Sequence, residues 1–220
     1  MNNRWAPGTL LFTLGEAEQR ELTGLGGKRV FPPGESLINE GDEGKESYIL
    51  LEGCCKVLCS TADGRSVLLS IRIGGDLVGE LAAFDGKPRS ATVVACTTVV
   101  ARVISQRTLL GYMERRPAVA QAIHLAVVEK VRRATTFRTF ASGAPTVMRL
   151  SFILDYLART YGSPCPEGTR IEVPLRQQEL ASLVGVSEPS LQRALARLRQ
   201  DNSIITRYRE IVVRDLLLNR

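Results

Sequence analysis

Turn signals recur about every ten residues between Arg29 and Val103, and this spacing constrains the fold more than any other feature of the chain. The runs between the turns mostly alternate apolar and polar residues, which predicts short strands with one buried face. Two clear strands are expected at 48–51 and 67–71, and Asp63-Gly64 before the second is a strong hairpin signal. The pattern predicts an antiparallel roll, barrel or sandwich, preceded by a helix at 16–25.

A different period begins after Pro117, where apolar residues recur at alternating steps of three and four. This predicts a helix of about 25 residues with one narrow seam. The seam consists of Ala120, Ile123, Val127, Lys130, Ala134 and Phe137. Such a helix packs on a copy of itself or on its own domain, and we expect a homodimer. Lys130 departs from the apolar seam, so it either binds an acidic partner or turns its ammonium to water. Ser-Gly-Ala-Pro at 142–145 should end the helix and form a hinge.

The remaining residues predict a winged helix-turn-helix. An amphipathic helix is expected at 149–160 and a loop at 162–168. Gly185 suits the turn between two short helices, and Ser187 can cap the second of them. That second helix would meet base edges, and strands at 204–206 and 210–213 would form a wing that contacts phosphates. The candidate DNA-binding residues are Arg176, Gln177, Ser187, Glu188, Pro189, Ser190, Gln192, Arg193, Arg197, Arg207 and Arg209.

The net charge of +6 lies in the second half of the chain. Residues 1–110 carry 12 Lys and Arg against 13 Asp and Glu, residues 111–143 carry 6 against 2, and residues 144–220 carry 11 against 8. A basic C-terminal half favours a polyanion, and we expect double-stranded DNA. The alternative is a nucleotide-binding module whose helix-turn-helix contacts protein.

The most informative motif is Gly-Glu-Leu-Ala at 79–82, followed after six residues by Arg-Ser-Ala. Gly79 should open a short helical turn whose free amides face an anion. Arg89, expected on the next strand, can neutralise a phosphate, and Glu80 can accept a hydrogen bond from a sugar hydroxyl. Phosphate and sugar together indicate a nucleotide, unless Glu80 and Arg89 merely pair with each other. The candidate ligand-binding residues here are Gly79, Glu80, Leu81, Ala82, Arg89, Ser90 and Ala91.

This cassette resembles that of the CRP/FNR (catabolite activator) superfamily of transcription regulators, and the resemblance covers nearly the whole chain. It implies an α+β fold in three parts: an N-terminal antiparallel β-roll that binds a cyclic nucleotide (1–110), a dimerisation helix and hinge (111–143), and a C-terminal winged helix-turn-helix domain (144–220). It also implies that the cassette holds the cyclic phosphate and the ribose 2′-hydroxyl. Ser90 after the arginine favours cyclic AMP as the effector, with cyclic GMP as the second candidate.

Two departures from the family pattern bear on specificity. Cyclic AMP-binding members have a Thr-Ser pair on the dimer helix that contacts adenine, and this chain has Ala134-Thr135-Thr136, so Thr135 and Thr136 are the candidates. The founding member reads its operator with an Arg-Glu pair, where this chain has Glu188-Pro189. Because proline cannot donate a hydrogen bond to a base edge, we predict a two-fold palindrome with a half-site other than TGTGA. Ligand binding should shift the dimer to a DNA-competent state, with RNA polymerase as a further partner.

Other classes of protein fit less well. The five cysteines lack a framework spacing, which predicts reduced thiols in the cytoplasm. We expect Cys54, Cys55, Cys59 and Cys96 to be small buried hydrophobes, with no metal and no cofactor; the alternative is a ligand-independent or thiol-responsive regulator of the same superfamily. A single histidine, no nucleophile elbow and no Walker loop argue against an enzyme. Uncharged stretches of at most 12 residues are too short to span a bilayer, and an N-terminus with only a short apolar patch at 10–12 does not predict a signal peptide.

Overall fold

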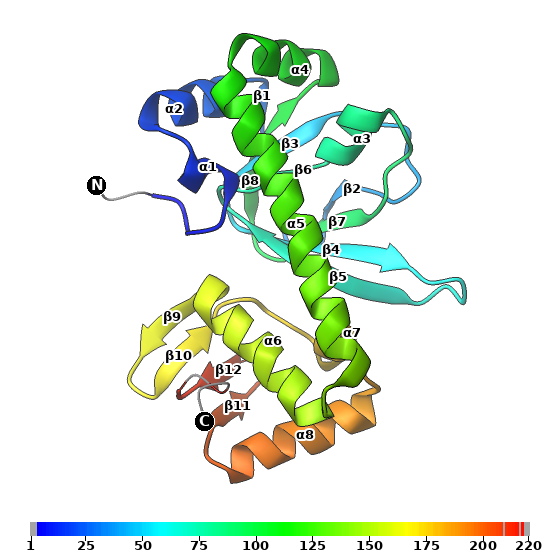
Figure 1. The fold of residues 1–220 in the computed structure, drawn as a ribbon, viewed down its shortest axis with the longest axis vertical. Helices are drawn as coiled ribbons and strands as arrows, with labels where there is room; N and C mark the ends of the chain where they lie inside the picture. The colour runs from blue at the N-terminus through cyan, green and yellow to red at the C-terminus, as the bar shows by residue number, and fades with distance from the viewer. Residues whose placement is uncertain (1–3, 209, 216, 218–220) are drawn as a thin grey trace. The chain divides into compact units, whose positions relative to one another are not determined.

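The computed structural model describes residues 4–208, 210–215 and 217, except for the side chain of residue 141 (Figure 1). The chain forms two compact units, Met1–Val131 and Arg132–Arg220. The division between them falls inside the longest helix, α5 (Pro117–Gly143). This helix confirms the long helix expected after Pro117, and its last residue lies within the Ser-Gly-Ala-Pro sequence predicted to end it.

The first unit is the predicted antiparallel roll, built from two four-stranded sheets. The first sheet has the order β1 (Gly27–Phe31), β8 (Val99–Ile104), β3 (Ser47–Glu52), β6 (Leu77–Val78). The second has the order β2 (Ser36–Ile38), β7 (Thr92–Ala95), β4 (Cys54–Ser60), β5 (Ser66–Ile73). The β4–β5 hairpin turns at Gly64, whose φ of 78° explains why glycine stands there. Both strands predicted most clearly, β3 and β5, are confirmed.

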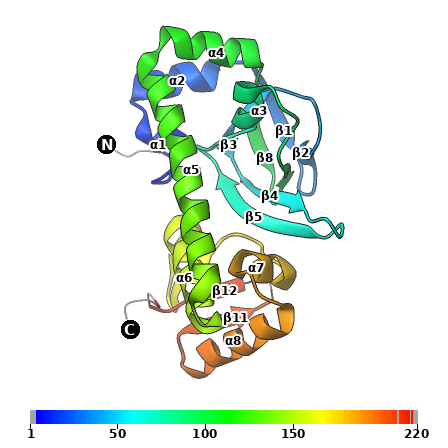
Figure 2. The ribbon, with the colours of Figure 1, turned by 45° about the vertical axis from the view of Figure 1, so that its right-hand side comes forward.

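Helices cover one part of the roll. They are α1 (Leu10–Thr13), α2 (Glu16–Gly24), α3 (Glu80–Asp85), α4 (Gln106–Arg115) and the first part of α5. The helix predicted at 16–25 is confirmed, whereas α4 was not predicted. Figures 1 and 2 both show α2 beside α4, and Glu21 joins them by accepting hydrogen bonds from Tyr112 at 3.0 Å and from Arg116.

The first part of the α5 seam packs on the roll, whereas Phe137 near its end contacts Phe152 and Tyr156 in the second unit, so of the two alternatives for this seam the structure shows packing within the chain. Ile123 is fully buried in the core that also contains Leu10 and Leu109. A second stripe of apolar side chains lies on α5 instead: Leu125, Val128 and Val131 are 60%, 46% and 62% exposed. The face available for another copy of the chain is therefore not the one that the spacing pointed to.

The second unit contains the predicted winged helix-turn-helix. Its elements are α6 (Thr146–Tyr161), β9 (Gly162–Cys165), β10 (Gly168–Ile171), α7 (Gln177–Val184), α8 (Glu188–Gln200), β11 (Ile204–Arg207) and β12 (Glu210–Val213). The prediction of a loop at 162–168 is wrong, because these residues enter a β9–β10 hairpin that extends the wing sheet in the order β11-β12-β10-β9. Gly-Ser-Pro-Cys has no strand pattern of its own, and its pairing depends on the neighbouring strands.

Candidate nucleotide and DNA-binding sites

Arg89 is held beside Gly79 inside the roll, where it is 5% exposed. One terminal nitrogen, Nη1, donates to the carbonyl of Gly79 at 2.8 Å; the other, Nη2, donates to the carbonyl of Glu46 at 2.6 Å and lies 3.4 Å from its carboxylate. Gly79 has φ +80°, and a Cβ there would lie 2.8 Å from Nη1 of Arg89. Both the backbone conformation and this close approach therefore require glycine. Arg89 precedes β7 and does not lie on it, because strand pairing begins only at Thr92; this corrects the prediction that Arg89 stands on the strand.

Glu80 lies one residue further on and forms a buried ion pair with Lys130 of α5. Their side chains are 5% and 20% exposed, and Nζ of Lys130 lies 2.8 Å from Oε1 of Glu80. The same Nζ donates to the carbonyl of Leu77 at 2.7 Å. Burial lowers the pKa of Lys130, and the Glu80 carboxylate opposes that shift. Lys130 thus binds an acidic partner, and that partner belongs to the cassette.

These two pairs exclude one of the readings of the cassette. Glu80 pairs with Lys130 and Arg89 with Glu46, so the alternative in which Glu80 and Arg89 merely pair with each other is wrong. The other cassette residues surround them: Leu81 and Ser90 are exposed, Ala82 is buried and Ala91 is half-buried. Gly79, Glu80 and Arg89 are therefore brought together at the start of α3, as the spacing predicted.

Sequence reasoning missed Arg72 and Glu46. Arg72 stands directly opposite Cys55 in the β4–β5 pair, so it faces the roll interior, where it is 9% exposed and donates to the carbonyl of Ile71 at 2.8 Å. Its positive charge contributes to lowering the pKa of Lys130. A charged residue within the apolar run 67–73 was the signal available for Arg72. Glu46 lies in a turn region and carried no such signal.

Thr135 and Thr136 lie on an exposed part of α5 that belongs to the second unit. The Thr136 hydroxyl donates to the carbonyl of Arg132 at 3.0 Å within the helix. Their contact with a nucleotide base stays a prediction.

The helix-turn-helix forms at the predicted residues. Gly185 ends α7 in the left-handed conformation with φ 69°, and Ser187 caps α8 by accepting a hydrogen bond from the amide of Ser190 at 3.4 Å. The predicted apolar face of α8 is buried and consists of Leu191, Ala194, Leu195 and Leu198. Glu188, Pro189 and Arg193 are exposed, as base-reading residues must be, and Arg193 donates to the Ser190 hydroxyl at 3.1 Å.

The remaining candidate DNA contacts differ in whether their side chains already have a partner within the chain. Arg176 and Gln177 are exposed where α7 begins, and Gln177 is hydrogen-bonded to Gln192. Arg197 pairs with Asp201 at 3.1 Å. Arg207 of the wing pairs with Glu167 and Glu210, and its hydrogen bond to Glu167 raises its pKa. Arg209 lies outside the described residues.

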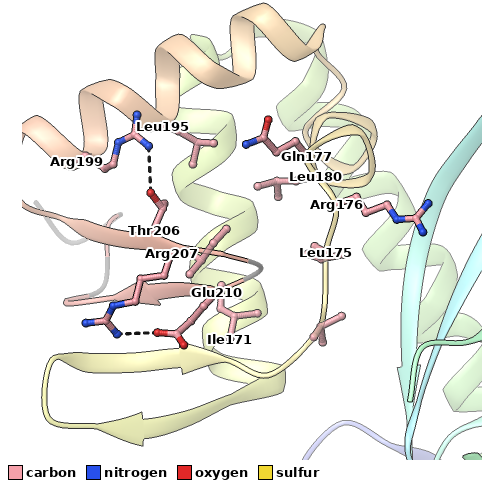
Figure 3. Close-up of a pocket in the computed structure, with 12 residues that line it drawn as sticks. Ile171, Leu175, Arg176, Gln177, Leu180, Leu195, Arg199, Thr206, Arg207 and Glu210 are labelled. Carbon is pink, nitrogen blue, oxygen red and sulfur yellow. Dashed lines mark hydrogen bonds and ion pairs between the residues drawn. The ribbon is translucent and has the colours of Figure 1, made fainter. Parts of the chain in front are cut away.

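A hollow lies between the wing, the start of α7 and α8 (Figure 3). Its lining includes the apolar side chains of Ile171, Leu180 and Leu195. At one side of the hollow, Arg199 donates to the Thr206 hydroxyl at 3.1 Å. This bond joins α8 to the β11–β12 hairpin.

Two absences hold for the part of the chain that the structure describes. None of its helices combines the length and apolar character needed to cross a bilayer. No three side chains among its His, Cys, Asp and Glu residues are grouped so that they could bind a metal ion.

Comparison with known proteins agrees with this geometry. The cyclic nucleotide-binding domain family matches residues 28–116, and the Crp-like helix-turn-helix domain family matches residues 149–217. A CRP-like cAMP-activated global transcriptional regulator of Mycobacterium tuberculosis is 28% identical over 185 residues, which cover 84% of this chain and 83% of that protein. The cAMP-activated global transcriptional regulator CRP of Escherichia coli is 26% identical over 191 residues, which cover 83% and 87%.

Solved structures show the same fold. The c-di-GMP-responsive global regulator CLP of Xanthomonas campestris superposes with a TM-score of 0.79 at 21% identity, over 91% of this chain and all of that one. A roll of the cyclic nucleotide-binding domain family, followed by a Crp-like helix-turn-helix domain, defines a DNA-binding transcription regulator. The chain belongs to the CRP/FNR superfamily of such regulators.

Proposed function

We propose that this chain is a homodimeric regulator whose DNA binding is switched by cyclic AMP bound in the roll. The observation that carries the proposal is the buried guanidinium of Arg89 beside the left-handed Gly79. A buried arginine presents a planar fork of N–H donors that can supply the counter-charge for a phosphate. Glu80 stands next to it as the acceptor for the ribose hydroxyl.

Two observations favour cyclic AMP over cyclic GMP. The relatives from M. tuberculosis and E. coli are described as cAMP-activated. Ser90 follows Arg89, as in the cyclic AMP-binding members that the cassette resembles. Cyclic GMP remains the second candidate.

The exposed stripe of Leu125, Val128 and Val131 supports the homodimer. Adjacent exposed apolar side chains on one helix face indicate a surface that another molecule covers. A second copy of α5 would present the same stripe, as a two-fold interface requires. Val128→Asp should convert the dimer to a monomer in analytical ultracentrifugation, whereas Ala17→Asp, at an exposed position of α2, should not.

The second unit is proposed to read a palindromic DNA site through Arg193 and the first turn of α8, with Arg176, Arg197 and Arg207 near phosphates. RNA polymerase and the cytoplasm are the expected partner and location. If the helix-turn-helix contacts protein instead, unbiased site selection will not enrich any duplex. DNA binding should also weaken steeply with salt, because phosphate contacts release counterions.

The deciding experiment is fluorescence anisotropy of a labelled duplex obtained by unbiased site selection, with and without cyclic AMP. We expect cyclic AMP to tighten DNA binding by the parent protein and to have no effect on Arg89→Leu. Arg65→Leu, which removes an exposed arginine at the tip of the β4–β5 hairpin, is the matched control and should respond like the parent. Equal DNA affinity with and without nucleotide in the parent would contradict the proposed switch and favour a ligand-independent regulator.

A further inference from the structure

Two thiols that neither site uses face each other across neighbouring strands of the roll. Cys54 begins β4, and Cys96 directly follows β7. The adjoining pair, Cys55 and Ala95, is in antiparallel register, which places Cys54 directly opposite Cys96. The amide of Cys96 donates to the carbonyl of Cys54 at 2.7 Å.

This placement suits a disulfide. Opposite residues in an antiparallel pair have Cα atoms about 4.5–5.5 Å apart, and disulfides usually join Cα atoms about 4.4–6.8 Å apart. Residues directly opposite each other in an antiparallel pair project to the same side of the sheet, so the register places both side chains on one side of the strand pair. We propose that Cys54 and Cys96 form a reversible disulfide when the protein meets a peroxide.

The surroundings assign a different role to each sulfur. Cys96 is half-buried and can be reached from solvent, whereas Cys54 is 7% exposed. The neighbouring Cys96 thiol and burial together raise the pKa of Cys54 far above its ordinary value, so Cys54 keeps its proton at neutral pH. Cys96 is the more accessible of the two sulfurs, and the thiolate is the form of a cysteine that attacks a peroxide. Cys96 is therefore oxidised first, and Cys54 resolves it.

The reaction balances with hydrogen peroxide as the oxidant. The Cys96 thiolate attacks one peroxide oxygen, the O–O bond breaks, and the released hydroxide takes up a proton to become water, which leaves Cys96 as a sulfenic acid. The Cys54 sulfur then attacks the Cys96 sulfur, the S–O bond breaks, and a second water leaves with the proton of Cys54. The two sulfurs lose two electrons in total, and the peroxide is reduced to two waters.

The bridge would close a loop that contains β5 and the whole nucleotide cassette, since both lie between Cys54 and Cys96 in the chain. The other cysteines have different surroundings. Cys55 is fully buried, Cys59 donates to the Glu40 carboxylate at 3.1 Å, and Cys165 belongs to the second unit. Cys59 is thus the matched control, because it is at least partly accessible but has a carboxylate for its partner.

The test is peroxide treatment of the full-length reduced protein, followed by thiol counting in denaturant and peptide mass mapping without reductant. The parent should lose two of its five thiols, and a cross-linked pair of tryptic peptides, two hydrogens lighter than their sum, should join 46–56 to 90–102. Dithiothreitol should restore both thiols. Cys59→Ser should form the same cross-link.

Two further variants assign the bond, because Cys54 and Cys55 share a tryptic peptide. Cys55→Ser should still form the cross-link, whereas Cys54→Ser should stop at a sulfenic acid on Cys96 that dimedone traps. A parent protein that keeps all five thiols, a cross-link that survives Cys54→Ser, or one that joins two copies of the chain would each overturn the proposal. The assay requires neither nucleotide nor DNA, so its outcome is independent of the proposed function.

Discussion

Replacing Lys130 by methionine should destabilise the roll unit strongly, because Glu80 would be left as a buried charge without its partner. Glu80 is 5% exposed, and its carboxylate lies 2.8 Å from the Lys130 ammonium. Removing one member of a buried ion pair costs about 3–5 kcal/mol. Lys130 keeps 20% exposure, so water can partly replace it, and we expect the lower end of that range, about 3 kcal/mol of unfolding free energy.

The single tryptophan makes this measurement specific to the roll. Trp5 is buried in the core that contains Leu10 and Leu11, so its fluorescence during urea unfolding reports on the first unit. The control is the double variant Glu80→Met/Lys130→Met. Buried ion pairs replaced by apolar groups of similar size are often neutral or stabilising, so the double variant should be clearly more stable than Lys130→Met.

The reasoning is refuted if Lys130→Met unfolds within about 0.5 kcal/mol of the parent, as a surface substitution would. It is also refuted if the double variant is no more stable than the single one. Either result would mean that the carboxylate of Glu80 does not depend on Lys130.

Three further predictions follow from single contacts. Gly79→Ala should lower both stability and cyclic AMP affinity, because its Cβ would lie 2.8 Å from Nη1 of Arg89. Gly64→Ala is the control, because Gly64 has a similar positive φ but a Cβ there would have no atom within 4 Å. Calorimetry should show unchanged nucleotide affinity for this control, with a stability loss of only about 1–2 kcal/mol. Burial and the hydrogen bond to Glu21 raise the pKa of Tyr112 to about 12, so the folded state holds this proton more tightly than the unfolded state. The contribution of Tyr112 to stability is therefore complete below pH 10 and is lost as the pH rises through 12. Tyr112→Phe should flatten this decline of the unfolding free energy, measured by urea titration at each pH. Arg193→Ala should weaken binding to the selected DNA site by about 10- to 100-fold while changing the salt slope little, whereas Arg159→Ala on α6 should leave anisotropy titrations unchanged.

Local patterns carried the parts of the fold that the sequence predicted correctly. Asp63-Gly64 determines its hairpin through the backbone conformation of one glycine, and Gly185 with Ser187 determines the turn and cap of the helix-turn-helix. The cassette was found in the same way, because Gly79 and Arg89 act at a short, fixed spacing. Such features need no knowledge of distant residues.

The errors and omissions arise where distant segments meet. The β9–β10 hairpin forms because β12 offers it an edge, although its own residues resemble a loop. The seam of α5 was identified as a periodic stripe, but period alone does not say which surface covers a stripe. Lys130 stands in the seam because it pairs with Glu80, and the sequence did not reveal this partner because it lies 50 residues away in the chain.

The most direct test of the account is a calorimetric titration of the reduced, folded protein with cyclic AMP and then with cyclic GMP. We expect saturable heat with cyclic AMP at one nucleotide per chain, weaker binding of cyclic GMP, and an affinity reduced at least about 30-fold in Arg89→Leu, since a buried phosphate would lose its charged partner. Absence of heat with both nucleotides, or unchanged affinity in Arg89→Leu, would contradict the claim that the roll is a nucleotide site built on Arg89.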